Sequence, residues 1–291
     1  MQRYIGIDLG GTNIKGALVS ETGKILKQRS VPPHAEAGAE AVTKTIAAMI
    51  CALAEGESVS GVGMGCPGTV DDREGTVVYA CNLGWVHYDV RTALRELTGY
   101  SVRLVNDANA AAYGEYIAGG AKGYNDAVVI TLGTGIGSGI ILGGKILRGF
   151  NFAAGEMGHN VIVKDGIQCT CGRKGCWERY APASALTRET KKAMQENKNT
   201  IMWQMTQDID HVNAKLAFDA MAKGDETAKQ VVDSWIEYVG VGIANVINTF
   251  EPEVICIGGG VSNQGEVLLA PVRAYAENET RNITTGKFPV I

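Results

Sequence analysis

Short apolar segments and glycine-rich turns alternate along the first third of the chain, with helical patterns between some of them. The apolar segments predict strands at residues 4–8, 14–19, 25–31, 61–66 and 102–105. Apolar residues at helical spacing predict helices at residues 39–53, 89–97 and 108–117. Strands that alternate with helices in this way are typical of an α/β layer with a mixed sheet.

The rest of the chain opens with the same order of strand, glycine-rich turn and strand. We expect a β-hairpin at 127–147, a strand at 254–257, and helices at about 183–196, 213–223, 225–249 and 264–279. Gly240 and Gly242 inside the long helix predict close packing against another segment. The glycine cluster near 119–123 is the expected boundary between a small N-terminal α/β domain, 1–118, and a large α/β domain, 119–291.

Composition narrows the class of protein. The 291 residues are 45% hydrophobic with a net charge of −4, and no run of Lys or Arg occurs, so neither nucleic acid nor a membrane is an expected partner. The uncharged stretch 127–144 is rich in glycine, which favours two buried strands over a membrane span. The N-terminus runs straight into a strand pattern without a secretory signal, so a cytoplasmic location is expected.

Four single cysteines are expected to be buried thiols: Cys51, Cys66, Cys81 and Cys256.

Two hairpin turns combine glycines with a threonine, and both could bind phosphate. The first contains Asp8, Gly10, Gly11, Thr12 and Asn13, with Lys15 close behind; the second contains Gly133, Thr134 and Gly135. Glycine lets consecutive backbone amides converge on an anion, and an acidic residue beside them suits Mg²⁺ shared with a phosphate. Ordinary hairpin turns are the alternative for each turn alone. A third glycine cluster, 258–260, follows the strand at 254–257 and favours a bound nucleotide.

Asp107 follows a predicted strand and begins a predicted helix. Such a residue is commonly an N-cap. It can also be the base that accepts a proton from a substrate hydroxyl during phosphoryl transfer, a reaction that asks for little beyond positioning and charge stabilisation.

Three cysteines and a histidine have the spacing of a metal site. His159, Cys169, Cys171 and Cys176 form a Cys₃His set, with glycines that allow a short loop to wrap around an ion. Four protein ligands leave no open position, so we expect a structural Zn²⁺. Unrelated reduced thiols are the alternative.

These motifs resemble those of a known superfamily and of one family within it. The two turns and the late glycines, including Gly259, are similar to the phosphate and adenosine motifs of the sugar kinase/actin/Hsp70 superfamily. The segment from Glu156 to Glu178 is similar to the signature of the ROK family of sugar kinases and repressors.

The resemblance implies a two-domain actin-like ATPase (ribonuclease H-like) fold, with a cleft between a small and a large domain, and it implies ATP and Mg²⁺ as cofactors. It favours the catalytic interpretation of Asp107. It also implies that several side chains bind a sugar, and that His159 binds the zinc through one ring nitrogen and the sugar through the other. The implied sugar-binding set is Gly68, Asn82, Asn106, Asp107, Glu156, His159 and Glu178.

The resemblance implies an ATP-dependent hexose kinase that acts on the 6-hydroxyl, most similar to bacterial glucokinases, in a homodimer or higher homo-oligomer. N-acetylglucosamine, N-acetylmannosamine, fructose and allose stay open as substrates. A sugar-responsive repressor is less expected, because those carry an N-terminal helix-turn-helix and here a strand starts at Arg3 or Tyr4. An actin-like or Hsp70-like ATPase is disfavoured by the zinc cluster. The resemblance also implies a helix beyond the position of Ile291 that returns to the small domain, and the sequence ends there.

Overall fold

The computed structural model describes residues 2–280 and 289–291, and the chain forms two compact units. The first unit comprises Met1–Lys122 and Ile146–Gly155, and the second comprises Gly123–Lys145 and Glu156–Ile291. The break after Lys122 lies close to the glycine cluster expected to divide the chain. The short segment at 146–155 joins the first unit, where Arg148 pairs with Asp72 at 3.0 Å.

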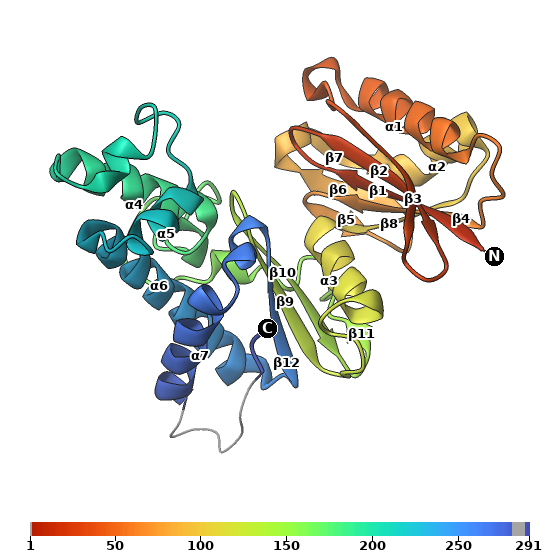
Figure 1. Cartoon of the computed structure of the whole chain (residues 1–291). Helices are drawn as coiled ribbons and strands as arrows, with labels where there is room; N and C mark the ends of the chain where they lie inside the picture. Colours follow the sequence, from red (N-terminus) through yellow and green to blue (C-terminus); the bar gives the residue numbers. More distant parts are fainter. Residues whose placement is uncertain (1, 281–288) are drawn as a thin grey trace. The chain divides into compact units, whose positions relative to one another are not determined.

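A five-stranded mixed sheet organises the first unit (Figure 1). Its order is β3 (Ile25–Val31), β2 (Ile14–Ser20), β1 (Arg3–Leu9), β4 (Gly61–Cys66) and β8 (Val102–Asn106). The first three strands pair antiparallel, while β1, β4 and β8 run parallel. Period-two alternation in β1 buries Ile5, Ile7 and Leu9 on one face of the sheet. All five strands were predicted from the sequence.

Three helices accompany this sheet, and they were predicted as well. Helices α1 (Ala39–Ala54) and α2 (Val90–Thr98) pack on the face that buries the apolar side chains of β1, while α3 (Asp107–Ala118) contacts β4 and β8. A second, three-stranded sheet, which was not predicted from the sequence, is formed by β5 (Thr69–Asp71), β6 (Thr76–Ala80) and β7 (Trp85–Asp89). These strands are only three to five residues long, so each pattern is too short to stand out.

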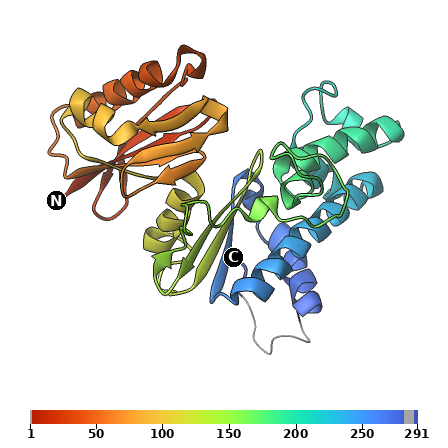
Figure 2. The same cartoon turned by 180° about the vertical axis from the view of Figure 1, so that it is seen from behind.

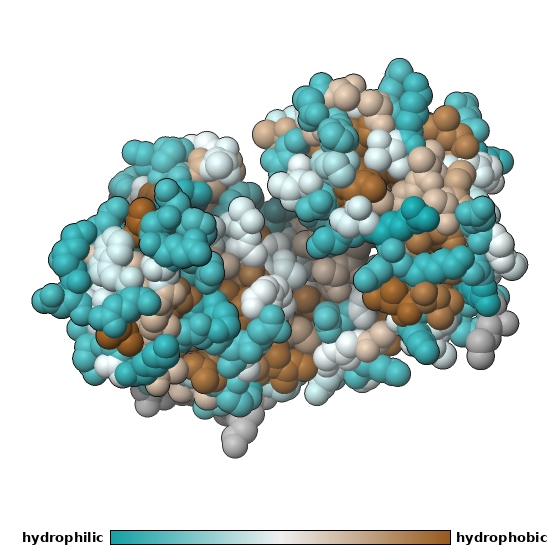
Figure 3. All heavy atoms as spheres, turned by 45° about the horizontal axis from the view of Figure 1, so that its top comes forward, coloured by the Kyte–Doolittle hydropathy of each residue, from teal (hydrophilic) through white to brown (hydrophobic). Residues whose placement is uncertain are grey.

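The second unit contains a four-stranded sheet with the order β11 (Lys145–Ile146), β10 (Ile136–Leu142), β9 (Ala127–Leu132) and β12 (Val254–Gly258). The hairpin β9–β10 and the parallel pair β9–β12 repeat the arrangement of β1, β2 and β4. The uncharged stretch 127–144 is therefore the expected pair of buried strands. No helix among the described residues is long and apolar enough to cross a membrane, and the face seen in Figure 3 is mostly hydrophilic.

Four helices complete this unit: α4 (Ala183–Glu196), α5 (Ala214–Met221), α6 (Glu226–Phe250) and α7 (Glu266–Thr280). Helices α6 and α7 run side by side (Figures 1 and 2). The predicted close packing of α6 is confirmed. A Cβ at Gly240 would overlap the ring of Tyr275, and one at Gly242 would overlap the indole of Trp177.

Candidate active site

The end of β8 and the start of α3 present the candidate base. Asn106 is the N-cap of α3, because its side-chain oxygen accepts a hydrogen bond from the Asn109 N–H at 3.1 Å. Its amide nitrogen donates to the Gly68 carbonyl at 3.0 Å. Asp107 is the first helical residue, and its carboxylate accepts from the Ala108 N–H at 2.9 Å. The alternative that Asp107 caps the helix is therefore wrong.

Two glycines bring the surrounding backbone close to this carboxylate. A Cβ at Gly65 on β4 would lie 3.2 Å from the Ala110 Cβ and 3.4 Å from the Asp107 Cα, so α3 starts directly against the strand. Gly68 has a φ of +87°, and a Cβ there would overlap the Tyr79 carbonyl oxygen. Gly68 thus contributes its backbone, which holds the side chain of Asn106.

The electrostatic surroundings of Asp107 suit a proton acceptor. Its side chain is exposed, yet neighbouring protein atoms partly desolvate the carboxylate, and this desolvation together with the negative charge of Asp8 raises its pKa. Burial, with the charge of Asp107 as a second cause, raises the pKa of the nearby Cys66 thiol to about 12, so this cysteine stays protonated at neutral pH. A carboxyl with a raised pKa holds a proton more readily than an ordinary aspartate.

The first candidate phosphate turn joins β1 to β2 beside this carboxylate. The turn is closed by a hydrogen bond from the Gly10 N–H to the Asn13 carbonyl at 2.9 Å, and Gly11, Thr12 and Asn13 are exposed. Asp8 and Lys15 are directly paired across the two strands, so their side chains share one face of the sheet.

A sugar-binding candidate lies beside the same turn. Asn82 is exposed on a short 3-10 turn, and a Cβ added at Gly11 would lie 4.0 Å from the Asn82 Cβ. A cavity of about 1120 Å³ on this face of the sheet is lined by Asp8 and Lys15 together with Arg103 and other residues. The first unit therefore gathers the candidate base, the predicted phosphate turn and three of the predicted sugar ligands: Gly68, Asn82 and Asn106.

The second candidate phosphate turn joins β9 to β10. It is closed by the Gly133 N–H, which donates to the Gly135 carbonyl at 3.0 Å, and the next amide, that of Ile136, donates to Glu178 at 3.3 Å. A Cβ at Gly135 would overlap the Glu178 carboxylate. Gly259 has a φ of +94°, and a Cβ there would overlap the Leu132 carbonyl. The structure therefore brings this turn together with Glu178 and Gly259.

The predicted metal ligands cluster in the same unit. One ligand atom from each of His159, Cys169, Cys171 and Cys176 lies within 4.8 Å of the other three. The Cys171 and Cys176 sulfurs are 3.6 Å apart, and the Cys169 sulfur is 3.7 Å from His159 Nδ1. Zinc–ligand bonds of about 2.0–2.3 Å in a tetrahedron place ligand atoms about 3.3–3.8 Å apart. The donor set and its spacing therefore fit a closed zinc site with His159 Nδ1 as the ligand atom.

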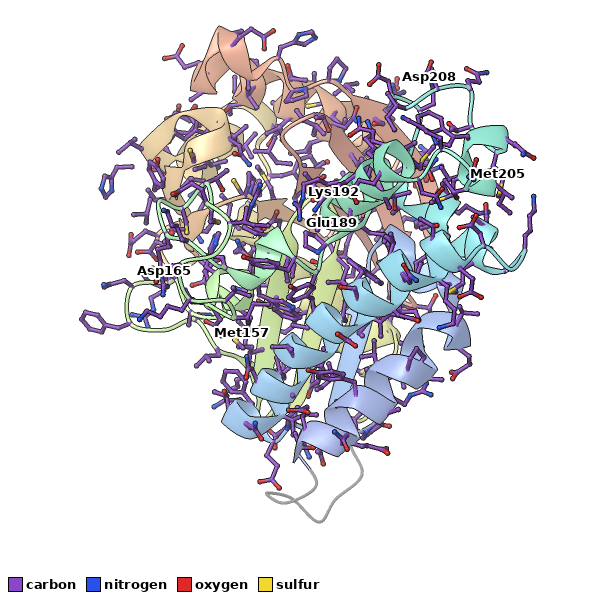
Figure 4. All side chains as sticks on the ribbon, turned by 90° about the vertical axis from the view of Figure 1, so that its left-hand side faces the viewer. Met157, Asp165, Glu189, Lys192, Met205 and Asp208 are labelled. Carbon is purple, nitrogen blue, oxygen red and sulfur yellow. The ribbon has the colours of Figure 1, made fainter. Side chains whose placement is uncertain are left out.

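The turn that carries Glu156 and His159 is held against β10. The Met157 N–H donates to the buried Ser138 hydroxyl at 3.0 Å, and a Cβ at Gly158 would be only 2.5 Å from the Ile136 carbonyl oxygen. Figure 4 shows Met157 on this turn and Asp165 on the loop that leads to the cysteines. Ser138 was not predicted as a site residue; its only signal was a polar residue between glycines in an apolar strand.

The single cysteines and Trp85 differ in their exposure to solvent. Cys51 and Cys81 are exposed, so the prediction that they are buried was wrong, whereas Cys66 and Cys256 are buried as expected. Trp85 is 2% exposed and packs edge-on against Tyr88, so it belongs to the core. Single thiols and aromatic rings lack a spacing that predicts their exposure.

Comparison with known proteins agrees with these motifs. The family model of the ROK family matches residues 4–286. This chain belongs to the ROK family. It is similar to the glucokinase of Thermotoga maritima, with 37% identity over 99% of this chain and 92% of that protein. It is also similar to the glucokinase of Halalkalibacterium halodurans, with 38% identity over 94% of this chain and 85% of that protein.

A solved structure extends the similarity to the fold. The ROK glucokinase from Streptomyces griseus, in complex with glucose and AMPPNP, is 36% identical and superposes with a TM-score of 0.87 over 99% of this chain and 93% of that chain. The fold of this ROK member is the α/β fold of the actin-like ATPases, as the resemblance implied.

Proposed function

We propose that this chain is an ATP-dependent glucokinase that transfers the γ-phosphoryl group of ATP to the 6-hydroxyl of glucose. The observation that carries the proposal is the position of Asp107 at the end of a parallel strand, next to Asp8 and the β1–β2 turn. Because Asn106 caps the helix, the Asp107 carboxylate is not needed for that role. Glucokinases at 37–38% identity over nearly the whole chain support the sugar, and the solved ROK glucokinase in complex with glucose and AMPPNP supports ATP as the donor.

In this mechanism Asp107 accepts the proton of the glucose 6-hydroxyl as its oxygen attacks the γ-phosphorus. The bond from that phosphorus to the β–γ bridging oxygen breaks, and ADP leaves. The two glycine turns, Gly10–Asn13 and Gly133–Gly135, bind the phosphate oxygens through backbone amides that are not used to close the turns, such as that of Gly135, and the Lys15 ammonium assists them. Asp8 is the candidate ligand of the Mg²⁺ that accompanies ATP, and this ion would supply positive charge beside the transferred group. The proposed adenosine contact is the backbone at Gly259.

Sugar recognition rests on polar side chains that match hydroxyl groups. We assign Asn82, Asn106, Glu156, His159 and Glu178 to this role, with the Gly68 carbonyl holding Asn106. Zinc bound by His159 Nδ1 and the three cysteines would fix the ring tautomer and leave Nε2 for a sugar hydroxyl.

We also propose that the chain forms a homodimer or higher homo-oligomer, supported by the family resemblance. Light scattering that gives the mass of a single chain would reject the oligomer.

A coupled assay of ADP release tests the proposed activity. Glucose, N-acetylglucosamine, N-acetylmannosamine, fructose and allose are compared at equal concentration, and we expect the highest kcat/KM for glucose. ATP consumption without any sugar should be negligible. Stronger turnover of another hexose would reassign the substrate, and sugar-independent ATP hydrolysis would reject the kinase.

A further inference from the structure

The peptide group between Thr134 and Gly135 is held from one side by a residue outside the turn. Ser184 is the second residue of α4, and its hydroxyl donates a hydrogen bond of 2.6 Å to the Thr134 carbonyl oxygen. Nothing in the motifs of the sequence pointed to Ser184. The contact joins the predicted phosphate turn to a helix that starts almost fifty residues later in the chain.

This hydrogen bond determines where the amide of Gly135 points. The C=O of residue 134 and the N–H of residue 135 belong to one planar trans peptide, in which they point in opposite directions. Since the carbonyl points at Ser184, the Gly135 N–H points away from α4. Glycine has the widest choice of backbone conformations, so the conformational preference of Gly135 alone does not set this direction.

The neighbouring amides of the turn are already occupied. The Gly133 N–H donates to the Gly135 carbonyl and the Ile136 N–H donates to Glu178. Within residues 2–280 and 289–291, the Gly135 N–H has no hydrogen-bond acceptor. An amide with a defined direction and no acceptor in the chain is suited to an anionic oxygen.

The helix behind the turn is a rigid support. Helix α4 buries Ala185, Leu186 and Met194, and packs on α5 and α6. In addition, Arg188 on α4 donates to the Arg179 carbonyl at 2.9 Å. Glu189 and Lys192 of the same helix, labelled in Figure 4, are not among these buried residues: Glu189 is half-buried and Lys192 is exposed. Ser184 is therefore presented from a fixed position.

We infer that Ser184 is a positioning residue for nucleotide phosphate: it orients the Thr134–Gly135 peptide so that the Gly135 N–H donates to a phosphate oxygen of ATP. The inference rests on the proposed function, because it assigns the ligand of the β9–β10 turn. Ser184 itself does not touch the nucleotide. Its effect is on phosphate binding and not on the sugar.

The test compares variants of one helix. Ser184→Ala removes the hydroxyl, Ser184→Thr retains it, and Thr187→Ala is the matched control, since the Thr187 hydroxyl donates to the Ala183 carbonyl of its own helix and not to the turn. We expect Ser184→Ala to raise the Kd and KM of Mg·ATP and the Kd of ADP about 3- to 10-fold, the loss of one ordinary hydrogen bond. The Kd of adenosine and of glucose should be unchanged, and Ser184→Thr and Thr187→Ala should resemble the wild type.

Other outcomes would contradict the positioning role of Ser184, the proposed function, or both. An unchanged Mg·ATP Kd in Ser184→Ala, or a parallel loss of adenosine and glucose affinity, would overturn the positioning role. If Ser184→Ala does not fold, Ser184→Cys, with a weak donor of similar size, replaces it and is judged by the same ratios. Wild-type protein that binds Mg·ATP but does not phosphorylate glucose would reject the proposed function, while the ATP Kd values still decide the role of Ser184. Wild-type protein that binds no Mg·ATP would overturn both.

Discussion

Asp107 and Asn106 are adjacent residues with similar side chains, and the structure separates their roles. Asn106 uses both ends of its amide, one on the Asn109 N–H and one on the Gly68 carbonyl. The Asp107 carboxylate accepts a hydrogen bond from the N–H of the next residue, Ala108, and its side chain is exposed, so it remains accessible to other partners. The order of amide and acid is therefore not interchangeable.

Asp107→Asn is expected to lower kcat about 10²–10⁴-fold and leave the glucose Kd largely intact, since an amide keeps the shape but cannot accept the proton. Steady-state kinetics and calorimetry measure the two effects. Asp89→Asn is the matched control: Asp89 caps α2 in the same unit by accepting from the Thr92 N–H, and asparagine also caps well. Near-normal turnover in Asp107→Asn would refute the role of the base.

The raised pKa of Asp107 has consequences for pH dependence. As pH falls, kcat should decline at a pH above the ordinary aspartate pKa of about 3.9, because the base must be ionised. Asp8→Asn removes a neighbouring negative charge and should lower the Asp107 pKa, as measured by carboxyl NMR titration. A pKa of Asp107 at or below the ordinary value would contradict this expectation.

The raised pKa of Asp107 also predicts how this residue affects the free energy of unfolding at different pH values. A folded pKa above the unfolded one means that the folded chain binds this proton more tightly. The stabilisation that this bound proton gives the folded chain is complete when the pH is below the pKa of Asp107 in the unfolded chain. It is lost as the pH rises through the pKa of Asp107 in the folded chain. Asp107→Asn should therefore not lower the thermal midpoint at pH 7, although it nearly abolishes activity.

At the scale of elements, Trp177 joins α6 to the segment 159–176 that carries the four metal ligands, here called the metal loop. This residue follows the last cysteine ligand, is 1% exposed, and donates from its indole N–H to the Tyr238 carbonyl at 2.8 Å. Gly242→Ala would force a methyl group into that indole and is expected to destabilise the fold by about 1–3 kcal/mol, the usual cost of overpacking a core. Urea unfolding measures the change.

Gly114→Ala on α3 is the matched control for that substitution. A Cβ at Gly114 meets nothing within 4 Å, so this change should stabilise the chain by up to about 1 kcal/mol through helix propensity. Equal effects of the two substitutions would show that packing against Trp177 is not the cause.

The metal loop is the second element with a distinct prediction. A strong chelator should release about one zinc per chain and abolish glucose binding, because His159 would lose its fixed tautomer and the loop its cross-link. Metal analysis and calorimetry follow the two losses. Cys171→Ser should reproduce them, while Cys51→Ser, at an exposed cysteine outside the cluster, should change neither. Undisturbed glucose affinity after metal loss would contradict the shared histidine.

At the scale of the whole molecule, the chain passes between the two units three times, after Lys122, Lys145 and Gly155. Ligand binding to the folded state should therefore be visible in the unfolding of the entire chain. At 100 times its Kd, glucose should add about 2.7 kcal/mol to the free energy of unfolding. Thermal unfolding with the five hexoses should show the largest shift for glucose, and a larger shift with another sugar would point to that sugar.

The sequence by itself determined the elements and the chemistry that depend on local order. Alternation, helical spacing and turn glycines predicted the strands of the first sheet, the hairpin β9–β10 and the long helices, because backbone preferences and side-chain periodicity act between near neighbours. The cysteine and histidine spacing predicted a metal cluster for the same reason: all four ligands lie within one loop.

Only the tertiary structure decided which side chains act on one another over long separations. Ser184 reaches Thr134, Glu178 reaches Ile136 and Asn106 reaches Gly68 through packing that no local pattern encodes. The exposure of Cys51 and Cys81 and the burial of Trp85 were likewise set by what folds over them. A residue's type states which bonds it can make, whereas the partner depends on how distant segments meet in the folded chain.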